Sequence, residues 1–168
     1  MQSSPWTARR MAVTGMVAAV YAAATIFMPI PQYGPIQCRL SEMMCLLAFI
    51  NPVFAPGIVL GCFIANLFSP VSPVLDAIFG TLHSAIALLF ITRFSKNMFV
   101  ASLWPTVFCF IIGGMILFTS GMELNVINFG AITGSVMAGQ FIAVTVVGYP
   151  LFLMLGKNKR FMDLLKSV

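Results

Sequence analysis

Charged residues are scarce in this chain. Only 8% of its 168 residues are Asp, Glu, Lys or Arg, whereas a soluble domain carries about 25%. Hydrophobic residues make up 60% of the sequence, and the mean hydropathy is +1.02. A soluble domain of this size leaves much of its surface in water and has no place for so much apolar surface. The composition therefore excludes a soluble fold and predicts an integral membrane protein.

Residues that bind metals or attack substrates are also scarce. His83 is the single histidine, so a Cys/His metal site cannot be built and we expect no metal. The four cysteines are scattered without a CxxC pair, and we interpret them as small hydrophobic residues rather than ligands or disulfides. These are Cys38, Cys45, Cys62 and Cys109.

Motifs for nucleotide binding and nucleophilic catalysis are missing as well. Gly113 and Gly114 lie in an apolar run that lacks the Lys and Ser/Thr of a phosphate loop. Ser135 lacks the pattern of an intramembrane serine protease, and His83 is the only base of the type that a serine nucleophile needs. We expect no enzymatic activity and no cofactor, so any ATP must be used by another chain.

Long apolar segments are what the sequence does contain. A spanning helix needs about 20 apolar residues, and breaks at Pro, Gly, Asn and charges divide the chain into six segments. They cover about 8–28, 40–50, 54–68, 74–92, 100–119 and a sixth ending near Leu155. We predict an all-α fold of six transmembrane helices. The second and third segments are short and could instead form a re-entrant pair, which would leave four full spans.

We expect one transmembrane domain over residues 1–168, with a short N-terminus (1–10) and a basic tail (157–168). The first apolar segment is too long for a cleavable signal peptide, and no small-residue cleavage site follows it. Phe161, Leu164 and Leu165 in the tail have helical spacing, which predicts a helix lying on the membrane surface.

The basic residues predict the orientation. With six spans, eight of the nine fall on one side, which the positive-inside rule makes the cytoplasm, so both termini lie inside. These are Arg9, Arg10, Arg93, Lys96, Lys157, Lys159, Arg160 and Lys166. Arg39 alone falls on the outer side, where Glu42, Asp76 and Glu123 also lie. This distribution argues against a nucleic-acid partner despite the net charge of +5.

The outer side holds a dense group of polar residues: Gln37, Arg39, Ser41 and Glu42. On insertion scales, placing an ionisable side chain at the centre of a membrane helix costs about 2.5–3.5 kcal/mol of free energy. The presence of such groups therefore calls for an explanation. One reading is that Arg39 and Glu42 neutralise each other while Ser41 caps the helix. We favour a polar floor for a ligand, because Gln37 adds a group that such a pair does not need.

Other polar residues extend the candidate site. Asp76 and His83 share a helical face with Gly80, as in a pocket wall, although Asp76 could simply cap its helix and His83 could be an interior histidine. Asn66 either ends its helix or faces the ligand. Gln140 either bonds between helices or faces the ligand, and Glu123 lies in a loop that is either solvated or part of the site.

Small residues recur every four positions in the first span. Gly15, Ala19 and Ala23 form one stripe, and Ala18 and Ala22 form another. Such stripes allow another helix to approach closely. They either pack within the chain or dock a partner protein.

Three blocks of sequence resemble the QueT family, whose members are substrate-binding S components of energy-coupling factor transporters. They are Gln37-x-Arg39-x-Ser41-Glu42 with residues 33–36 before it, Gly57-x-x-x-Gly61-x-x-x-Ala65-Asn66, and residues 76–82. Together with the alanine stripe, the resemblance covers nearly the whole chain.

The resemblance implies a six-helix fold in a bacterial plasma membrane, with a pocket near the outer face and the first loop as its lid. The implied cargo is a queuosine precursor, 7-aminomethyl-7-deazaguanine or a relative. The first helix would dock on a transmembrane coupling subunit, two cytoplasmic ATPases would drive the cycle, and toppling would release the cargo. The family pattern implies an acidic residue where this chain has Gln140, a neutral partner. The alternatives are an S component for another vitamin-like molecule, or a membrane scaffold or assembly protein.

Overall fold

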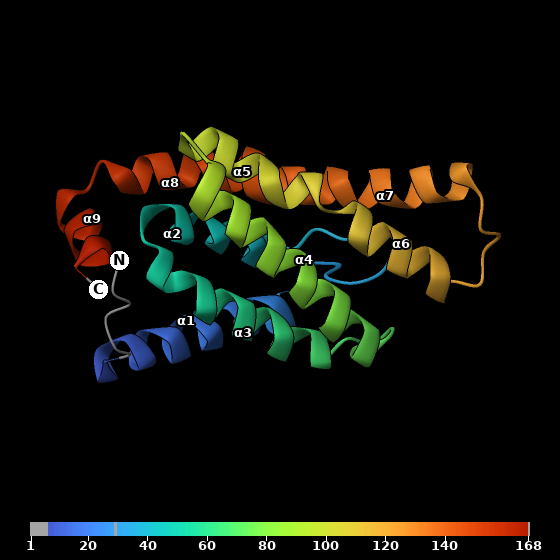
Figure 1. The fold of residues 1–168 in the computed structure, drawn as a ribbon, viewed down its shortest axis with the longest axis horizontal. Coiled ribbons are helices and arrows are strands. Elements are labelled where there is room, and N and C mark those ends of the chain that lie inside the picture. Colours follow the sequence, from blue (N-terminus) through green and yellow to red (C-terminus); the bar gives the residue numbers. More distant parts are fainter. Residues whose placement is uncertain (1–6, 29, 168) are drawn as a thin grey trace.

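A computed structural model describes residues 7–28 and 30–167, and within these residues all regular structure is helical. The chain passes back and forth along one long axis in six successive segments (Figure 1). They are α1 (Ala8–Phe27); η1 (Leu40–Met44) with α2 (Cys45–Ile50); η2 (Pro52–Phe54) with α3 (Ala55–Leu67); α4 (Pro73–Phe94); α5 (Met98–Val107) with α6 (Phe110–Thr119); and α7 (Val126–Phe141) with η3 (Ile142–Gly148) and α8 (Tyr149–Gly156). A final helix, α9 (Lys159–Lys166), lies beside the end where α1 begins (Figure 1).

Four segments are long and apolar enough to cross a membrane: Ala8–Phe27, Pro73–Phe94, Met98–Thr119 and Val126–Gly156. Leu40–Ile50 and Pro52–Leu67 are shorter apolar helices. At a rise of 1.5 Å per residue the first of these covers about 16 Å, roughly half of a hydrocarbon core of about 30 Å. Within residues 7–28 and 30–167 the structure thus gives four candidate membrane-spanning helices, and a count of six crossings stays a prediction.

Asparagine side chains begin several of the helices. Asn97, Asn125 and Asn158 each accept a backbone N–H bond from the residue three positions later, at 2.7–3.3 Å. This is the usual N-cap arrangement, which satisfies an amide that the first helical turn leaves free. The polar breaks in the sequence therefore set the ends of α5, α7 and α9.

Glycines bring α1 and α3 into close contact. A Cβ atom at Gly57 would lie 2.8 Å from the carbonyl oxygen of Thr14, and one at Gly61 would lie 2.8 Å from that of Ala18. Close packing of this kind takes the place of a hydrophobic driving force between membrane helices. Ala18 and Ala22 are buried on this side of α1, so one of the two predicted stripes packs within the chain.

Two segments depart from regular α-helix in ways that the sequence did not predict. Pro105 lies inside α5, and the helix ends at Val107 before α6 begins at Phe110. The sixth segment contains a seven-residue π-helix, Ile142–Gly148, and Thr145 in it donates to the Ser102 carbonyl of α5 at 3.1 Å. π-Segments are uncommon and occur frequently at functional sites.

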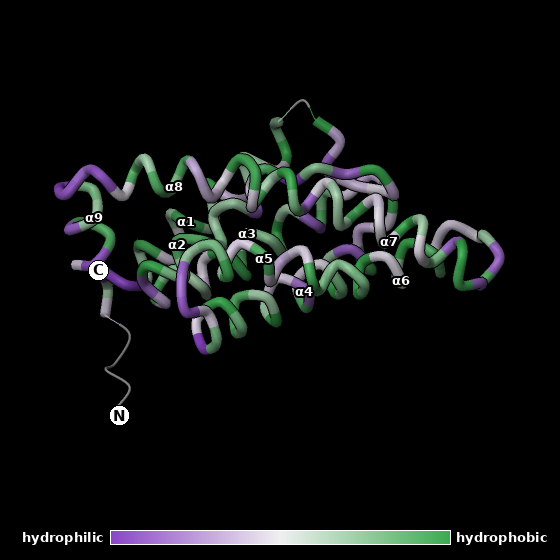
Figure 2. The backbone as a smooth tube through the Cα atoms, turned by 90° about the horizontal axis from the view of Figure 1, so that it is seen from above, coloured by the Kyte–Doolittle hydropathy of each residue, from purple (hydrophilic) through white to green (hydrophobic). Residues whose placement is uncertain are grey.

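The tail is helical, as predicted, and this helix packs on its own chain; its location on the membrane surface stays a prediction. Leu165 of α9 is buried, Phe161 packs against the core, and Leu164 is exposed. Asn51, after α2, donates to the Leu165 carbonyl at 3.0 Å. Hydrophilic residues gather around α9 and at the α6–α7 loop, at opposite ends of the molecule (Figure 2). The predicted N-terminus 1–10 lies only partly within the described residues.

Candidate binding site

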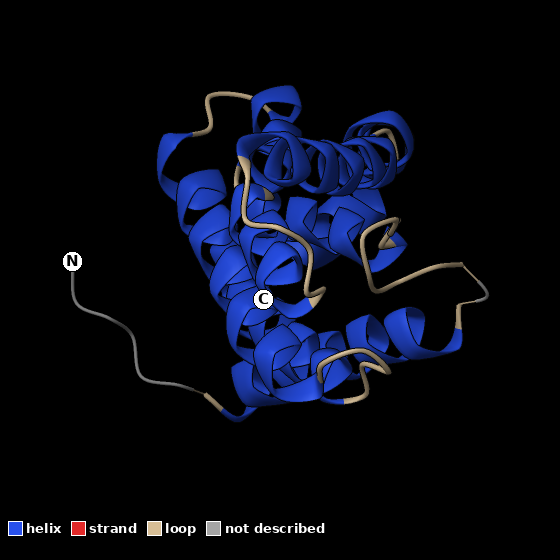
Figure 3. Cartoon of the chain, turned by 90° about the vertical axis from the view of Figure 1, so that its right-hand side faces the viewer, coloured by secondary structure: helices blue, strands red, loops and turns tan. Residues whose placement is uncertain are grey.

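The loop before η1 folds back against the helices rather than extending away. Within it, Cys38 donates its N–H to the Pro31 carbonyl at 2.8 Å, and Gly34 turns the chain with a φ of 93°. The Gln37 carbonyl lies directly against Gly139 of α7, where no space remains for a Cβ atom. In Figure 3, loops lie at the end of the bundle among the helices. Residues 30–39 therefore form a folded cover, here called the lid loop.

Tyr33 fastens the lid loop to α3. Its hydroxyl donates to the Ala65 carbonyl at 2.6 Å, and its ring lies 5.5 Å from the guanidinium carbon of Arg39. Burial raises the pKa of the Tyr33 phenol above its ordinary value. The hydroxyl thus stays protonated and keeps donating to the carbonyl at any physiological pH.

Glu42 is almost fully buried, with 1% of its surface exposed. Its Oε1 accepts from the Tyr21 hydroxyl of α1 at 2.6 Å and from the Ser84 hydroxyl of α4 at 3.4 Å. Its Oε2 accepts the weaker thiol bond of Cys45 at 3.4 Å. Hydrogen bonds from α1, α2 and α4 thus hold one carboxylate in the interior, as a buried charge requires.

Arg39 is buried beside it but bonds elsewhere. Its Nη2 donates to the Asn66 Oδ1 of α3 at 2.9 Å. Arg39 is still in extended conformation, with φ −92° and ψ 91°, just before η1 begins. The guanidinium therefore reaches α3 and bonds Asn66 rather than Glu42, and both readings of the Arg39 and Glu42 pair stay open.

A chain of hydrogen bonds joins the two charged groups through α3 and α4. The Asn66 amide donates to the Cys62 thiol at 3.3 Å, and that thiol lies 3.3 Å from the Ser84 hydroxyl. Ser84 in turn donates to Glu42. We call these residues, Arg39, Asn66, Cys62, Ser84 and Glu42, the buried network. Charged hydrogen-bonded groups at this depth are costly to insert and are usually functional.

Three buried nitrogen donors of the lid loop and of α7 have no hydrogen-bond partner. They are the Nε2 atom of Gln32, the Nε atom of Arg39 and the Nε2 atom of Gln140. Gln140 lies on α7, one residue after the glycine that the lid loop contacts. Buried donors in folded proteins are normally satisfied, so each orphan calls for an explanation. An acceptor atom on a bound ligand is one partner that would satisfy such a donor.

Other predicted residues make their hydrogen bonds outside the buried network. Asp76, half-buried at the start of α4, accepts from the Ser69 hydroxyl and lines a cavity of about 80 Å³ beneath Gly34 of the lid loop. His83 lies 2.8 Å from the Pro105 carbonyl, as an interior histidine bonding between helices does. Ser41 is bonded to Thr25 of α1 at 2.6 Å and does not act as a cap.

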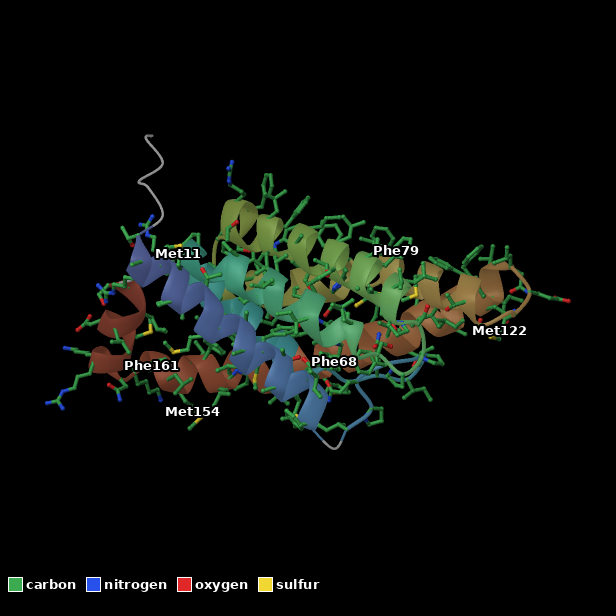
Figure 4. All side chains as sticks on the ribbon, turned by 90° about the horizontal axis from the view of Figure 1, so that it is seen from below. Met11, Phe68, Phe79, Met122, Met154 and Phe161 are labelled. Atoms are coloured by element: carbon green, nitrogen blue, oxygen red, sulfur yellow. The ribbon has the colours of Figure 1, made fainter. Side chains whose placement is uncertain are left out.

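Glu123 is not brought to the buried network. It is exposed in the loop between α6 and α7, beside Met122. Figure 4 shows Met122 at the tip of the molecule, at the opposite end from Met11 and Phe161. The prediction that Glu123 belongs to the site therefore has no support from the contacts of this conformation.

Outside the site, the exposed stripe of α1 differs from the buried one. Gly15, Ala19 and Ala23 are exposed on the outer side of this helix. A Cβ atom built at Gly15 meets nothing within 4 Å. This stripe is thus free of intramolecular packing, unlike the stripe of Ala18 and Ala22.

Sequence reasoning missed four members of this arrangement: Tyr21, Thr25, Cys62 and Ser84. Each lies in an apolar run and was attributed to the span rather than to the site. For Tyr21 and Thr25, the spacing along the sequence could have indicated their place in the site. Tyr21 and Thr25 lie four apart on one face of α1, and a polar pair on one helical face points to a common polar neighbour.

Comparison with known sequences places the chain in a family. The family model described as QueT transporter matches residues 11–157. The chain belongs to this family. It is 28% identical over 140 residues to the queuosine precursor transporter QueT of Lactococcus lactis subsp. cremoris (strain MG1363), an alignment that covers 78% of this chain and 83% of the relative. No solved structure matches the chain. A transporter family also agrees with the expectation that the chain is not an enzyme.

Proposed function

We propose that the chain is the substrate-binding S component of an energy-coupling factor importer for a queuosine precursor, 7-aminomethyl-7-deazaguanine or a close relative. Membership of the QueT transporter family and the name of the Lactococcus lactis relative support the substrate class. The observation that carries the proposal is the buried network, with the unpartnered donor of Arg39 within it and that of Gln140 on α7. Buried ionisable residues in a membrane protein are by default candidates for a functional site.

The network offers the groups that this cargo needs. A deazaguanine presents two parallel N–H donors on its pairing edge, and one carboxylate accepts both. Glu42 Oε2 carries only the thiol bond of Cys45, and a carboxylate has about four lone-pair positions, so it retains capacity for the cargo. The carbonyl oxygen of the base accepts from Arg39 Nε and Gln140 Nε2. Asp76, beneath the lid loop, receives the aminomethyl cation.

The lid loop controls access to this site from the outer side. Non-helical backbone is tolerated at membrane depth only where protein covers it or where it lines a cavity. The loop satisfies this through Tyr33, bonded to α3, and through Gln37, packed on Gly139. In our proposal both contacts separate when the cargo enters.

The membrane orientation follows from the charges. The first turn of α1, the end of α4 with the turn after it, and the segment from Lys157 through α9 carry eight of the nine basic side chains. Those three regions lie at the same end of the molecule (Figure 1). We assign this end to the cytoplasm of a bacterium, with the chain in the plasma membrane and six segments crossing it wholly or in part.

Release requires partners that the chain does not contain. The exposed stripe of Gly15, Ala19 and Ala23 is the surface that we assign to a transmembrane coupling subunit. Two cytoplasmic ATPases bound to that subunit supply the energy, and the chain topples within the membrane to open its site inward. The chain itself needs no cofactor for this role.

Ligand-dependent thermal unfolding of the purified chain tests the proposal. We expect 7-aminomethyl-7-deazaguanine to raise the melting temperature, and a panel of vitamins to leave it unchanged. Glu42→Gln removes a charge-assisted bond of about 1.5–3 kcal/mol, so it should weaken cargo binding about tenfold or more. Asp163→Asn, at an exposed position of α9, removes the same charge elsewhere and should bind normally.

Each contrary result has a distinct meaning. A chain stabilised by a vitamin and by no deazaguanine is an S component for another cargo. A chain that assembles with partners but binds neither class is a scaffold. Normal cargo binding by Glu42→Gln would remove Glu42 from the site.

A further inference from the structure

A second cavity borders the lid loop, beside the ends of α1 and α3. It has a volume of about 310 Å³, and its lining comes from the end of α1, the lid loop and the residues after α3. Gln32 and Tyr33 line it, whereas the next two residues, Gly34 and Pro35, line the smaller cavity that contains Asp76. The lid loop thus contributes to two cavities, and we call the larger one the α1–α3 cavity.

Gln32 brings an unpartnered amide to the α1–α3 cavity. The residue is only 5% exposed, and both its Nε2 and its Oε1 atoms are buried without a hydrogen bond. Burying an amide in this state costs free energy, which an apolar side chain of the same length would avoid. A ligand group that presents a donor and an acceptor side by side would satisfy both atoms at once.

The rest of the lining suits a flat, uncharged ring. Tyr33 and Phe68 contribute aromatic side chains, on which nucleobases of any kind can stack. Ile26 and Ile30 contribute apolar surface. The volume lies at the lower end of the range for small-molecule pockets, about 300–1,000 Å³. Among the lining residues that the structure describes none is charged, so a phosphate or an ammonium group would meet no opposite charge there.

The cavity reaches both the surface and the binding site. Phe68, labelled in Figure 4, is 65% exposed at its rim. Deeper in the lining, Thr25 shares a hydrogen bond with Ser41 at 2.6 Å, and the Tyr33 ring lies 5.5 Å from the guanidinium carbon of Arg39. Tyr33 thus touches the cavity on one side and a charged member of the buried network on the other.

From these contacts we infer that the α1–α3 cavity is an entry subsite, which binds the base of the cargo before it reaches the buried network. The inference rests on the proposed function and adds a first step to it. The ring N–H and the adjacent carbonyl of the base pair with the Gln32 amide, and the ring lies against Tyr33 and Phe68. When the Tyr33 hydroxyl leaves the Ala65 carbonyl, the base moves on to the buried network.

Binding in two steps has a kinetic signature, because the order of binding and conformational change is a kinetic property. The observed association rate rises with cargo concentration and then levels off, and the half-saturation concentration reports the affinity of the entry subsite. Phe68→Trp places a fluorescent ring at the exposed rim of the cavity. Stopped-flow fluorescence of this full-length chain in lipid nanodiscs, mixed with 7-aminomethyl-7-deazaguanine, measures the rate. The chain without this substitution gives the background from the native tryptophans.

Gln32→Met, added to the Phe68→Trp chain, keeps the length of the side chain and removes both polar atoms. We expect it to raise the half-saturation concentration about tenfold, as the loss of two net hydrogen bonds allows. The equilibrium dissociation constant of radiolabelled cargo should change by less than about threefold, because Gln32 does not contact the cargo in its final place. The melting temperature of the cargo-free chain should stay equal or rise, since an unpartnered amide has been removed.

Thr14→Val is the matched control. The Thr14 Oγ1 atom is also buried without a partner, and Thr14 lies about 16 Å along α1 from Thr25. The half-saturation concentration should therefore stay unchanged in this variant. Gln32→Asn keeps the amide but draws it back by one methylene group, and it should raise the half-saturation concentration as well. If the Gln32→Met chain cannot be purified, Gln32→Asn decides the question.

The outcomes separate the entry subsite from the proposed function. An association rate that rises without levelling off overturns the entry subsite and leaves the proposed function intact. An unchanged half-saturation concentration in the Gln32 variants does the same, and with a lowered melting temperature it gives the amide a purely structural role. Emission of the Phe68→Trp chain that differs between detergent and nanodiscs but ignores cargo would mean that a lipid fills the cavity, which also overturns the subsite. Failure of the unsubstituted chain to bind radiolabelled cargo at equilibrium overturns the proposed function, and the entry subsite with it.

Discussion

Gly80 of α4 lies directly against the side-chain amide of Asn66 in α3, and no room remains there for a Cβ atom. The same Asn66 accepts the guanidinium of Arg39 at 2.9 Å. The position of Arg39, before η1, is therefore fixed by a glycine two helices away. The absence of a side chain at Gly80 of α4 is therefore needed to place the Arg39 guanidinium.

Gly80→Ala should weaken cargo binding by about tenfold, a loss near 1.4 kcal/mol. The added methyl group displaces the Asn66 amide, and Arg39 loses its partner. Isothermal titration with the deazaguanine cargo measures the effect. Gly134→Ala is the matched control, because a Cβ atom there meets nothing within 4 Å; it should bind cargo normally. Equal affinities for both variants would contradict the role of Asn66.

Cys38 offers a way to watch the lid loop. It is half-buried, whereas Cys45, Cys62 and Cys109 are buried. Burial raises the pKa of the Cys38 thiol, so the thiol is protonated at neutral pH and less of it is the reactive thiolate. Maleimide labelling at Cys38 should therefore be slow at pH 7 and accelerate as pH rises toward that pKa. Labelling at pH 7 that is as fast as that of a fully exposed cysteine would mean that the loop is open.

The contact between Gln37 and Gly139 should hold the lid loop closed. Gly139→Ala places a methyl group where the Gln37 carbonyl lies, so we expect Cys38 labelling at pH 7 to become several-fold faster. Saturating cargo should slow it again in the unsubstituted chain. Cys38→Ser provides the background from the other thiols. A labelling rate that Gly139→Ala leaves unchanged would show that this contact does not keep the loop in place.

Larger side chains on the exposed stripe of α1 should block docking of the coupling subunit. Ala19→Leu and Ala23→Leu add side chains on the exposed face and should abolish co-purification with the coupling subunit and its ATPases, while cargo binding stays intact. Ala138→Leu, at an exposed position of α7, is the control and should still co-purify. Undiminished association of the Ala19 and Ala23 variants would place the docking surface elsewhere.

Gln140 tests which precursor the site prefers. Replacing its neutral amide by a carboxylate, Gln140→Glu, should raise the preference for the cationic aminomethyl cargo over a neutral nitrile analogue by about tenfold, because the aminomethyl group is attached next to the base carbonyl that we assign to Gln140, and opposite charges in a partly buried site attract strongly. Competition binding with the two compounds gives this ratio. If the ratio does not move, Gln140 faces a neighbouring helix and not the cargo.

Much of the architecture could be read from the sequence, because hydrocarbon demands long apolar helices and polar residues interrupt them. The first helix was expected over 8–28 and spans Ala8–Phe27, and the second was expected and found over 40–50. The break at Pro105 and the π-segment Ile142–Gly148 were not foreseen. The break and the π-segment depend on hydrogen bonds that backbone carbonyls accept from other helices, such as the bond between His83 and the Pro105 carbonyl. The local apolar character of the sequence does not show these bonds.

The sequence predicted only those residues of the candidate site that are neighbours along the chain. Arg39, Ser41 and Glu42 stand together in the sequence, so their grouping was evident. Their actual partners are Asn66, Thr25 and Tyr21, on other helices. The sequence could not tell which of the two alanine stripes packs within the chain, because they lie less than a third of a turn apart around α1. Only the glycines of α3 decide which stripe is buried.

The short second helix has a consequence for the cost of opening the site. Leu40–Ile50 covers about half the hydrocarbon thickness, and in our proposal the lid loop fills the rest of that crossing from the outer side. Opening the proposed site then displaces about ten loop residues and leaves the four candidate membrane-spanning helices in place. We therefore expect a molecule the size of a nucleobase to reach the buried charges without any long helix leaving the bilayer.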